Sequence, residues 1–85
     1  MSTFIFTVFA KKRFIKLDTA VQHRITLKLK ELKKQGAVGA VLKPLHNFEP
    51  ATHRLRIGDY RLILRRENPE TFIILDVGHR SSVYQ

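Results

Sequence analysis

THRLRIGDYRLILRRENPETFIILDVGHRSSVY, which spans residues 52–84, determines most of the architecture of this 85-residue chain. Apolar and basic residues alternate over residues 52–57 and again over residues 60–66, which is the period of strands with one buried face. Gly58 and Asp59 separate the two runs. A two-residue loop with glycine first favours a type II′ hairpin turn, so we predict an antiparallel hairpin.

The length of the turn also predicts how the two strands pair, because a tight turn fixes the register. Successive side chains point to opposite faces of a sheet, so one face is apolar and the other is basic. The predicted pairs are Ile57 with Tyr60, Arg56 with Arg61, Leu55 with Leu62 and Arg54 with Ile63. The apolar face carries Leu55, Ile57, Tyr60, Leu62 and Leu64, and the basic face carries Arg54, Arg56, Arg61 and Arg65.

A third strand is predicted at residues 71–77, after a four-residue turn at residues 67–70. The three strands then form an antiparallel meander. This count places Ile73 opposite Leu64 and Leu75 opposite Leu62 on the apolar face, and Asp76 opposite Arg61 on the basic face.

The N-terminal half predicts one strand and two helices. Residues 3–9 are β-branched and aromatic, as in a strand, and a short helix follows from Ala10. Asp18 is a candidate N-cap for a longer helix that ends near Gly36, and residues 36–51 are predicted to form a loop. The apolar stripe of the longer helix is Val21, Ile25, Leu29 and Leu32.

These elements predict one α+β domain over residues 1–85, with the helices on the apolar face of the sheet and the arginine face open. The N-terminal apolar run is too short to cross a bilayer, so we expect a complete, cytoplasmic protein without a membrane partner. The chain has no cysteine, and its histidines lack the spacing of metal ligands. No metal or other cofactor is therefore expected.

Charge is the strongest global feature, because 16 Lys and Arg stand against 7 Asp and Glu, a net charge of +9. Such an excess favours a polyanionic partner, although solubility alone would also account for it. Residues 11–34 hold nine basic and two acidic residues, which indicates either a solvated helix face or a surface that follows phosphates. Lys28 and Lys33 are the candidates on that surface.

The basic face of the hairpin is the candidate site. Like charges directly opposite one another destabilise a sheet, so Arg56 opposite Arg61 favours a bound anion such as phosphate, which arginine binds with two hydrogen bonds. An ordinary solvated face is the alternative. Arg54, Arg56 and Arg65 are the candidate RNA-binding residues on the strands.

The end of the third strand adds groups suited to RNA cleavage, which needs a base for the 2′-hydroxyl, an acid for the 5′-oxygen and cations for the phosphorane. Arg61 and Arg80 supply charge, and His79 is a candidate acid or base. Tyr84 is a base only if the arginines lower its pKa, and it would otherwise stack on a nucleobase or cover the core.

The runs HRLRIGDYRLIL and ILDVGHRSSVY resemble the RelE/ParE superfamily of toxins from prokaryotic toxin–antitoxin pairs, and the resemblance covers nearly the whole chain. It implies a small antiparallel sheet packed on a helical pair. Members of the RelE branch cleave ribosome-bound mRNA, whereas members of the ParE branch poison DNA gyrase. Carried over, the RelE site residues fall on Arg54, Arg56, Arg61, Arg80 and Tyr84.

One departure concerns the base, because the RelE toxin has lysines where this chain has Arg54 and Arg56, and arginine stays protonated in proteins. His79 or Tyr84 would then take that role. The prediction is a type II toxin that cleaves mRNA in the ribosomal A site by 2′-hydroxyl attack. Its expected partners are mRNA, the 70S ribosome and an acidic antitoxin, in a hetero-oligomer. The alternatives are a gyrase inhibitor without catalysis and a non-catalytic domain that binds RNA or an antitoxin.

Overall fold

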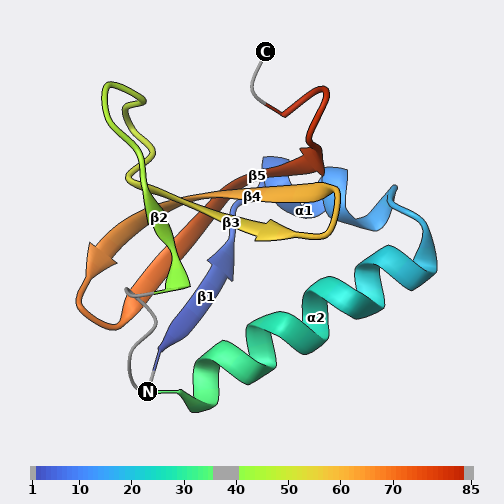
Figure 1. Cartoon of the computed structure of the whole chain (residues 1–85), viewed down its shortest axis with the longest axis horizontal. Helices are drawn as coiled ribbons and strands as arrows, with labels where there is room; N and C mark the ends of the chain where they lie inside the picture. The colour runs from blue at the N-terminus through green and yellow to red at the C-terminus, as the bar shows by residue number, and fades with distance from the viewer. Residues whose placement is uncertain (1, 36–40, 84–85) are drawn as a thin grey trace.

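The computed structural model describes residues 2–35 and 41–83. Within these residues the fold is α+β, as predicted, with both helices against a single mixed sheet (Figure 1). The elements in chain order are β1 (Thr3–Phe6), α1 (Val8–Ile15), α2 (Thr19–Lys34), β2 (Lys43–Pro44), β3 (His53–Ile57), β4 (Tyr60–Asn68) and β5 (Thr71–His79).

The strands lie in the order β1-β5-β4-β3-β2. The meander of β3, β4 and β5 is antiparallel as predicted, and β1 pairs in parallel with β5 at one edge. The two-residue β2 pairs with β3 at the other edge, so the prediction of an uninterrupted loop over residues 36–51 is wrong there. Pro44 is tolerated because its missing N–H is harmless on an edge strand.

The first strand is shorter than predicted, because it ends at Phe6 rather than at residue 9. The Thr7 side chain accepts a hydrogen bond from the Ala10 backbone N–H at 3.0 Å, so it caps α1 and starts the helix at Val8. Asp18 is the N-cap residue of α2 as predicted, but its side chain makes no capping hydrogen bond. The predicted cap at Gly36 lies outside the described residues.

The predicted hairpin register is confirmed, with Ile57 opposite Tyr60 and Arg56 opposite Arg61. Gly58 has φ +60°, the left-handed conformation that a type II′ turn requires at its first position. Among the described non-glycine residues only Asn47 has a positive φ, so the following Asp59 also has the sign expected for this turn.

The predicted pairing of β5 is wrong. β4 continues to Asn68, which leaves two residues in the turn, and the β4–β5 ladder shifts register between Ile63 and Leu64 and again between Arg66 and Asn68. A β-bulge of this kind changes which side chains share a face. The residues of β5 that enter the main core are therefore Phe72, Ile74 and Val77, and Asp76 pairs with Ile63 rather than Arg61.

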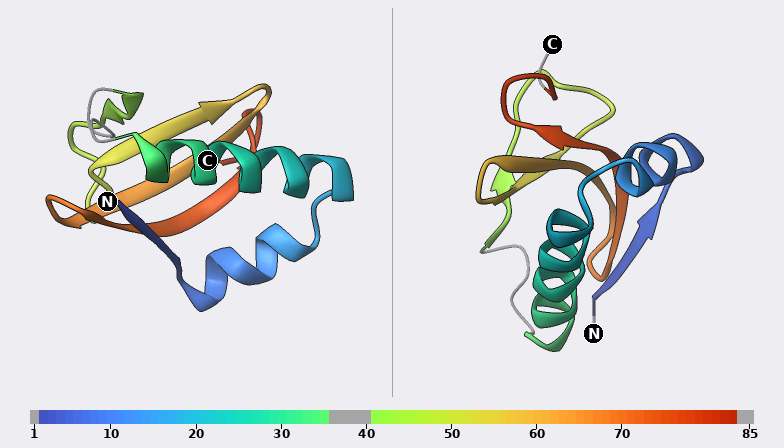
Figure 2. Two further views of the ribbon diagram at one scale, coloured as in Figure 1. Left: turned by 90° about the horizontal axis from the view of Figure 1, so that it is seen from below. Right: turned by 90° about the vertical axis from the view of Figure 1, so that its right-hand side faces the viewer.

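Two apolar clusters lie on opposite faces of the sheet. Both helices contribute to the larger one, in which Ala10, Phe14, Ile25 and Leu32 pack on β3, β4 and β5 (Figure 2). The smaller cluster joins Ala51, Ile63 and Val83, with Leu45 and Leu75 against it. The loop after β2 and the C-terminal segment rise on this side, away from α2 (Figure 1). The predicted arginine face is thus only partly open.

Candidate functional site

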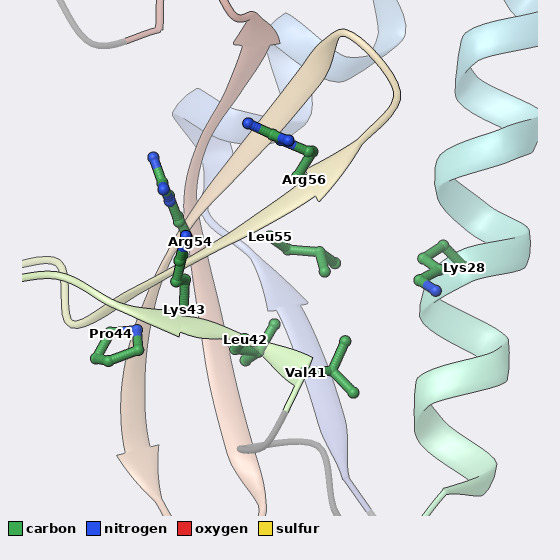
Figure 3. A pocket seen from close by; sticks show the side chains of 8 residues that line it. All are labelled: Lys28, Val41, Leu42, Lys43, Pro44, Arg54, Leu55 and Arg56. Atoms are coloured by element: carbon green, nitrogen blue, oxygen red, sulfur yellow. The ribbon is translucent and has the colours of Figure 1, made fainter.

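Two of the candidate arginines project from β3, near the edge of the sheet. Arg54 and Arg56 extend to one side of the strand, whereas Leu55 points to the other side, toward Lys28 of α2 (Figure 3). Arg56 is exposed and Arg54 is half-buried. Lys43 on β2 lies directly opposite Arg54. This alternation is the predicted one, and it gathers three cations at one edge.

Arg61 differs from the other candidates because it is buried, with 6% of its surface exposed. Its Nη1 atom donates hydrogen bonds to the backbone oxygens of Gly58 and Tyr60, both at 3.0 Å. These carbonyl dipoles offset part of the electrostatic repulsion between Arg56 and Arg61. The sequence analysis expected a bound anion to offset that repulsion. No buried side-chain nitrogen or oxygen in the described part of the chain lacks a hydrogen-bond partner.

Guanidinium groups from three separate parts of the chain lie close to the hairpin turn at Gly58 and Asp59. The Arg80 backbone N–H donates to the Asp59 carbonyl at 2.8 Å, and its Nε atom lies 3.9 Å from Asp59 Oδ1. Arg24 of α2 also reaches the turn. Its Nη1 atom lies 3.1 Å from the point that a Cβ atom would occupy if residue 58 were not glycine. The structure therefore brings Arg61 and Arg80 together at the turn and adds Arg24, which the sequence pattern did not single out.

His79 lies at the rim of the sheet, on the opposite side from Arg61. It pairs with Tyr60, and the two rings meet edge to face with centroids 5.5 Å apart. Directly paired residues share a face, and neighbouring residues along a strand alternate. His79 Nδ1 shares a 2.8 Å hydrogen bond with Ser81 Oγ. The structure thus does not bring His79 together with the basic face.

The ring of His79 borders a hollow that also contains Arg13 and Lys16 of α1. The sequence pattern did not single out Arg13, and it placed Asp76 opposite Arg61. In the structure the Arg13 Nε atom lies 3.3 Å from Asp76 Oδ1, so this acid neutralises a helix residue instead.

The remaining candidates are dispersed. Arg65 Nη2 lies 2.7 Å from Glu67 Oε2, so an acidic side chain pairs with this candidate RNA-binding residue. Lys28 lines a groove beside Arg54 and Arg56, whereas Lys33 borders a separate hollow between the helices and β1. Tyr84 lies outside the described residues.

Neither a membrane span nor a metal cluster emerges from residues 2–35 and 41–83. No helix there has the length and apolar character needed to cross a bilayer. Likewise, those residues include no group of three or more His, Asp or Glu side chains placed to hold a metal ion.

A family model described as the ParE toxin of type II toxin–antitoxin systems matches residues 4–84. The chain belongs to this toxin family. This confirms the RelE/ParE superfamily resemblance noted in the hairpin and C-terminal runs, and it makes the protein a type II toxin. No curated protein sequence gives a significant match.

Solved structures of RelE proteins share the fold. The toxin–antitoxin complex RelBE2 from Mycobacterium tuberculosis matches with a TM-score of 0.76 and 29% identity, covering 95% of this chain and 93% of that one. The RelB–RelE complex from Methanococcus jannaschii gives 0.72 and 24%, with 94% of each chain covered. The isolated E. coli RelE toxin gives 0.70 and 22%, covering 99% and 92%. The sheet with its helical pair is therefore the fold of this toxin superfamily.

Proposed function

We propose that this toxin is a ribosome-dependent endoribonuclease that cleaves mRNA in the A site. The observation that carries the proposal is the cluster of Arg24, Arg61 and Arg80 around the hairpin turn. Asp59 is the acid within this cluster, and its contact with Arg80 is long and exposed. Several positioned cations with little acidic compensation suit a phosphodiester whose negative charge increases in the transition state.

In the proposed reaction the ribose 2′-hydroxyl attacks the adjacent phosphorus, and the bond to the 5′-oxygen breaks. The products are a 2′,3′-cyclic phosphate and a 5′-hydroxyl, and no metal is required. Arg61 and Arg80 stabilise the phosphorane. Tyr84 is the proposed proton-transfer group, because the His79 ring lies on the opposite side of the sheet from Arg61. Arg54, Arg56, Arg65, Lys28 and Lys33 are the proposed RNA-binding residues.

The proposed dependence on ribosomes is supported by the exposure of the turn. The side chains of Arg80 and Asp59 are 64% and 68% exposed, so the surface around them leaves a free RNA strand mobile. Correct orientation contributes about 7–11 kcal/mol to such reactions. We infer that the ribosome supplies it by holding the message in the decoding site.

The same proposal includes a neutralising partner in the cytoplasm. Type II toxins are paired with antitoxins, and three of the similar solved structures are complexes of a RelE-type toxin with its antitoxin. The net charge of +9 favours an antitoxin with acidic residues. We expect the two proteins to form a hetero-oligomer.

Inhibition of DNA gyrase without catalysis is the second candidate, and the match to a ParE family model favours it. A toxin of this kind would bind its target protein and need no proton transfer. A basic domain that only binds RNA or the antitoxin is the third.

The test is primer extension on a translated message, with and without 70S ribosomes, beside a gyrase supercoiling assay. Cuts inside codons that require ribosomes, with unaffected gyrase, support the proposal. Gyrase inhibition with intact mRNA would move the protein to the second candidate and withdraw the catalytic roles. Binding of RNA or of the antitoxin, without mRNA cleavage and without gyrase inhibition, would leave only the third candidate, a basic binding domain.

A further inference from the structure

The hollow beside His79 lies at the end of the sheet, where β5 ends next to α1 (Figure 1). Arg13 and the C-cap residue Lys16 border it from α1, and the paired residues Tyr60 and His79 border it from β4 and β5. Its volume is about 390 Å³, and sites for small ligands have volumes of about 300–1,000 Å³. The hollow adjoins the arginine cluster at the hairpin turn, because His79 directly precedes Arg80.

The hydrogen bonds of His79 determine what its ring can offer a ligand. Its Nδ1 atom receives the Ser81 backbone N–H at 3.2 Å and shares a 2.8 Å hydrogen bond with Ser81 Oγ. A backbone N–H can only donate, so Nδ1 carries no proton and the neutral ring carries its proton on Nε2. The ring therefore offers an N–H donor, which suits a phosphate oxygen or a nucleobase carbonyl. It is poorly suited to proton abstraction, because the lone pair of Nδ1 is already engaged.

Two aromatic rings form one wall of the hollow. The rings of Tyr60 and His79 meet at 85° with centroids 5.5 Å apart, and both residues are half-buried. When two rings meet edge to face, the ring that presents its edge keeps both of its own faces clear of the other ring. Nucleobases of single-stranded RNA stack on aromatic faces of this kind.

Cations form the opposite wall. The Arg13 Nη2 atom lies 3.0 Å from the point that a Cβ atom would occupy at residue 78, so Gly78 leaves room for this guanidinium group at the end of β5. Asp76 neutralises Arg13 through the contact with Nε. Lys16 is exposed, and the described residues that line the hollow include no carboxylate. The charge of Lys16 is therefore available to an anionic ligand.

This combination of rings and cations distinguishes between two anionic partners. An acidic peptide would pair with Lys16 and Arg13 but would leave the aromatic wall unused. Single-stranded RNA uses both walls, because it binds through phosphate contacts with cations and through base stacking on aromatic side chains. A single nucleotide also suits the size of the hollow.

We propose that the hollow binds one nucleotide of a single-stranded RNA, next to the phosphate held by the arginine cluster. Its base stacks on the ring pair of Tyr60 and His79, and its phosphate contacts Lys16 and Arg13. The Nε2–H group of His79 donates a hydrogen bond to the same nucleotide. His79 is then a binding residue that takes no part in proton transfer. The inference rests on the proposed function in one respect, which is that RNA is the ligand.

The experiment is a titration of ¹⁵N-labelled toxin with a 2′-O-methylated uridine trinucleotide, which binds as RNA but cannot be cleaved. The amide signals of Lys16, Gly78 and His79 should shift. Lys16→Ala should weaken binding roughly three- to tenfold and reduce the slope of log affinity against log salt by about 0.7, because one phosphate contact is lost. Lys12→Ala removes the same charge from an exposed position of α1 outside the hollow, and it should leave the slope unchanged.

Two substitutions of His79 test the aromatic wall. His79→Ala should weaken the trinucleotide roughly fivefold or more, because a stacking surface is lost. His79→Phe keeps a ring and should weaken it less. Unchanged amide signals in α2 and β3 would show that the variants keep the fold, and the wild-type titration decides whether the hollow is occupied without any variant.

Three results would overturn the inference. The first is no shift of these signals at millimolar trinucleotide. The second is inorganic phosphate or uridine monophosphate that binds as tightly as the trinucleotide, which would make the hollow a site for a free anion or a free nucleotide. The third is a peptide alternating valine with glutamate that shifts the same signals at lower concentration, which would make the hollow a protein-binding site.

The outcome is independent of the test for cleavage, because the methylated analogue reports binding alone. An empty hollow would leave the proposed ribonuclease activity standing. Intact mRNA in the primer-extension assay, with the trinucleotide bound as expected, would instead remove the catalytic proposal and keep the nucleotide site.

Discussion

The two faces of the sheet differ in packing and in charge, although the same strands form both. On the helix side, Leu62, Leu64, Phe72, Ile74 and Val77 are all fully buried and pack under two helices. On the opposite side, a small cluster around Ile63 shares the surface with charged side chains. The first face is determined by burial of apolar area alone, whereas the second has to satisfy packing, charge and hydrogen bonding together.

Arg56 and Arg61 show this contrast within one pair. They lie directly opposite one another, yet Arg56 is exposed and Arg61 is 6% exposed. The difference arises because the carbonyls of Gly58 and Tyr60 accept hydrogen bonds from Arg61. The alternation of side chains along a strand therefore predicts which face of the sheet a residue occupies. Nearby hydrogen-bond acceptors decide how deeply that residue is buried.

The largest expected effect tests the difference in packing between the two faces. Phe72→Ala should lower the free energy of unfolding by about 3–5 kcal/mol, because it removes a fully buried ring and leaves a cavity. Leu75→Ala on the opposite face should cost about 1–2 kcal/mol, since the side chain is only half-buried. Urea unfolding of both variants measures the difference. Equal losses would mean that the second face is as tightly packed as the first.

A smaller effect separates the two paired arginines. Arg61→Ala should cost about 1–3 kcal/mol, because hydrogen bonds from a charged group are lost and two carbonyls lose their donor. Arg56→Ala should change stability by less than about 0.5 kcal/mol, as is usual for exposed positions. Denaturant midpoints of the two variants provide the comparison. If Arg56→Ala were the more costly, the assignment of Arg61 to the turn would be wrong.

The smallest effect concerns His53 on the helix side. Burial lowers the pKa of His53 below its ordinary value of 6.5, and the charge of Arg66 lowers it further. The folded state therefore disfavours the protonated ring, so stability is retained above about pH 6.5 and falls as the pH drops below it.

His53→Gln should reduce this loss between pH 7.5 and 5.5, as measured by thermal unfolding. His46→Gln, at an exposed position, is the matched control. A wild-type and a His53→Gln protein with the same pH dependence would show that the ring is not desolvated.

The sequence predicts the hairpin well because a two-residue turn leaves one register. The sequence does not predict the pairing of β5, because the β4–β5 ladder contains register shifts. No residue in the local sequence indicates where these shifts occur. Residues 7–9 were misassigned for a related reason. Their β-branched and aromatic side chains suit a strand, but the cap supplied by Thr7 starts a helix.

The candidate site was predictable to a similar extent. Alternation identified Arg54, Arg56 and Arg61, and proximity to the turn explains Arg80. The approach of Arg24 and the pairing of Arg13 with Asp76 depend on how the helices lie against the sheet. Such contacts between distant segments have no signal in spacing along the chain.

In the proposed function, the arginines around the hairpin turn promote cleavage of mRNA on the ribosome. The most direct measurement is the single-turnover rate of A-site cleavage by Arg80→Ala, with 70S ribosomes present and Lys12→Ala as the matched control. Loss of one such donor should slow cleavage roughly 10²–10³-fold, while Lys12→Ala should cleave at the wild-type rate. Cleavage by Arg80→Ala at the wild-type rate would contradict a role of these arginines in the reaction.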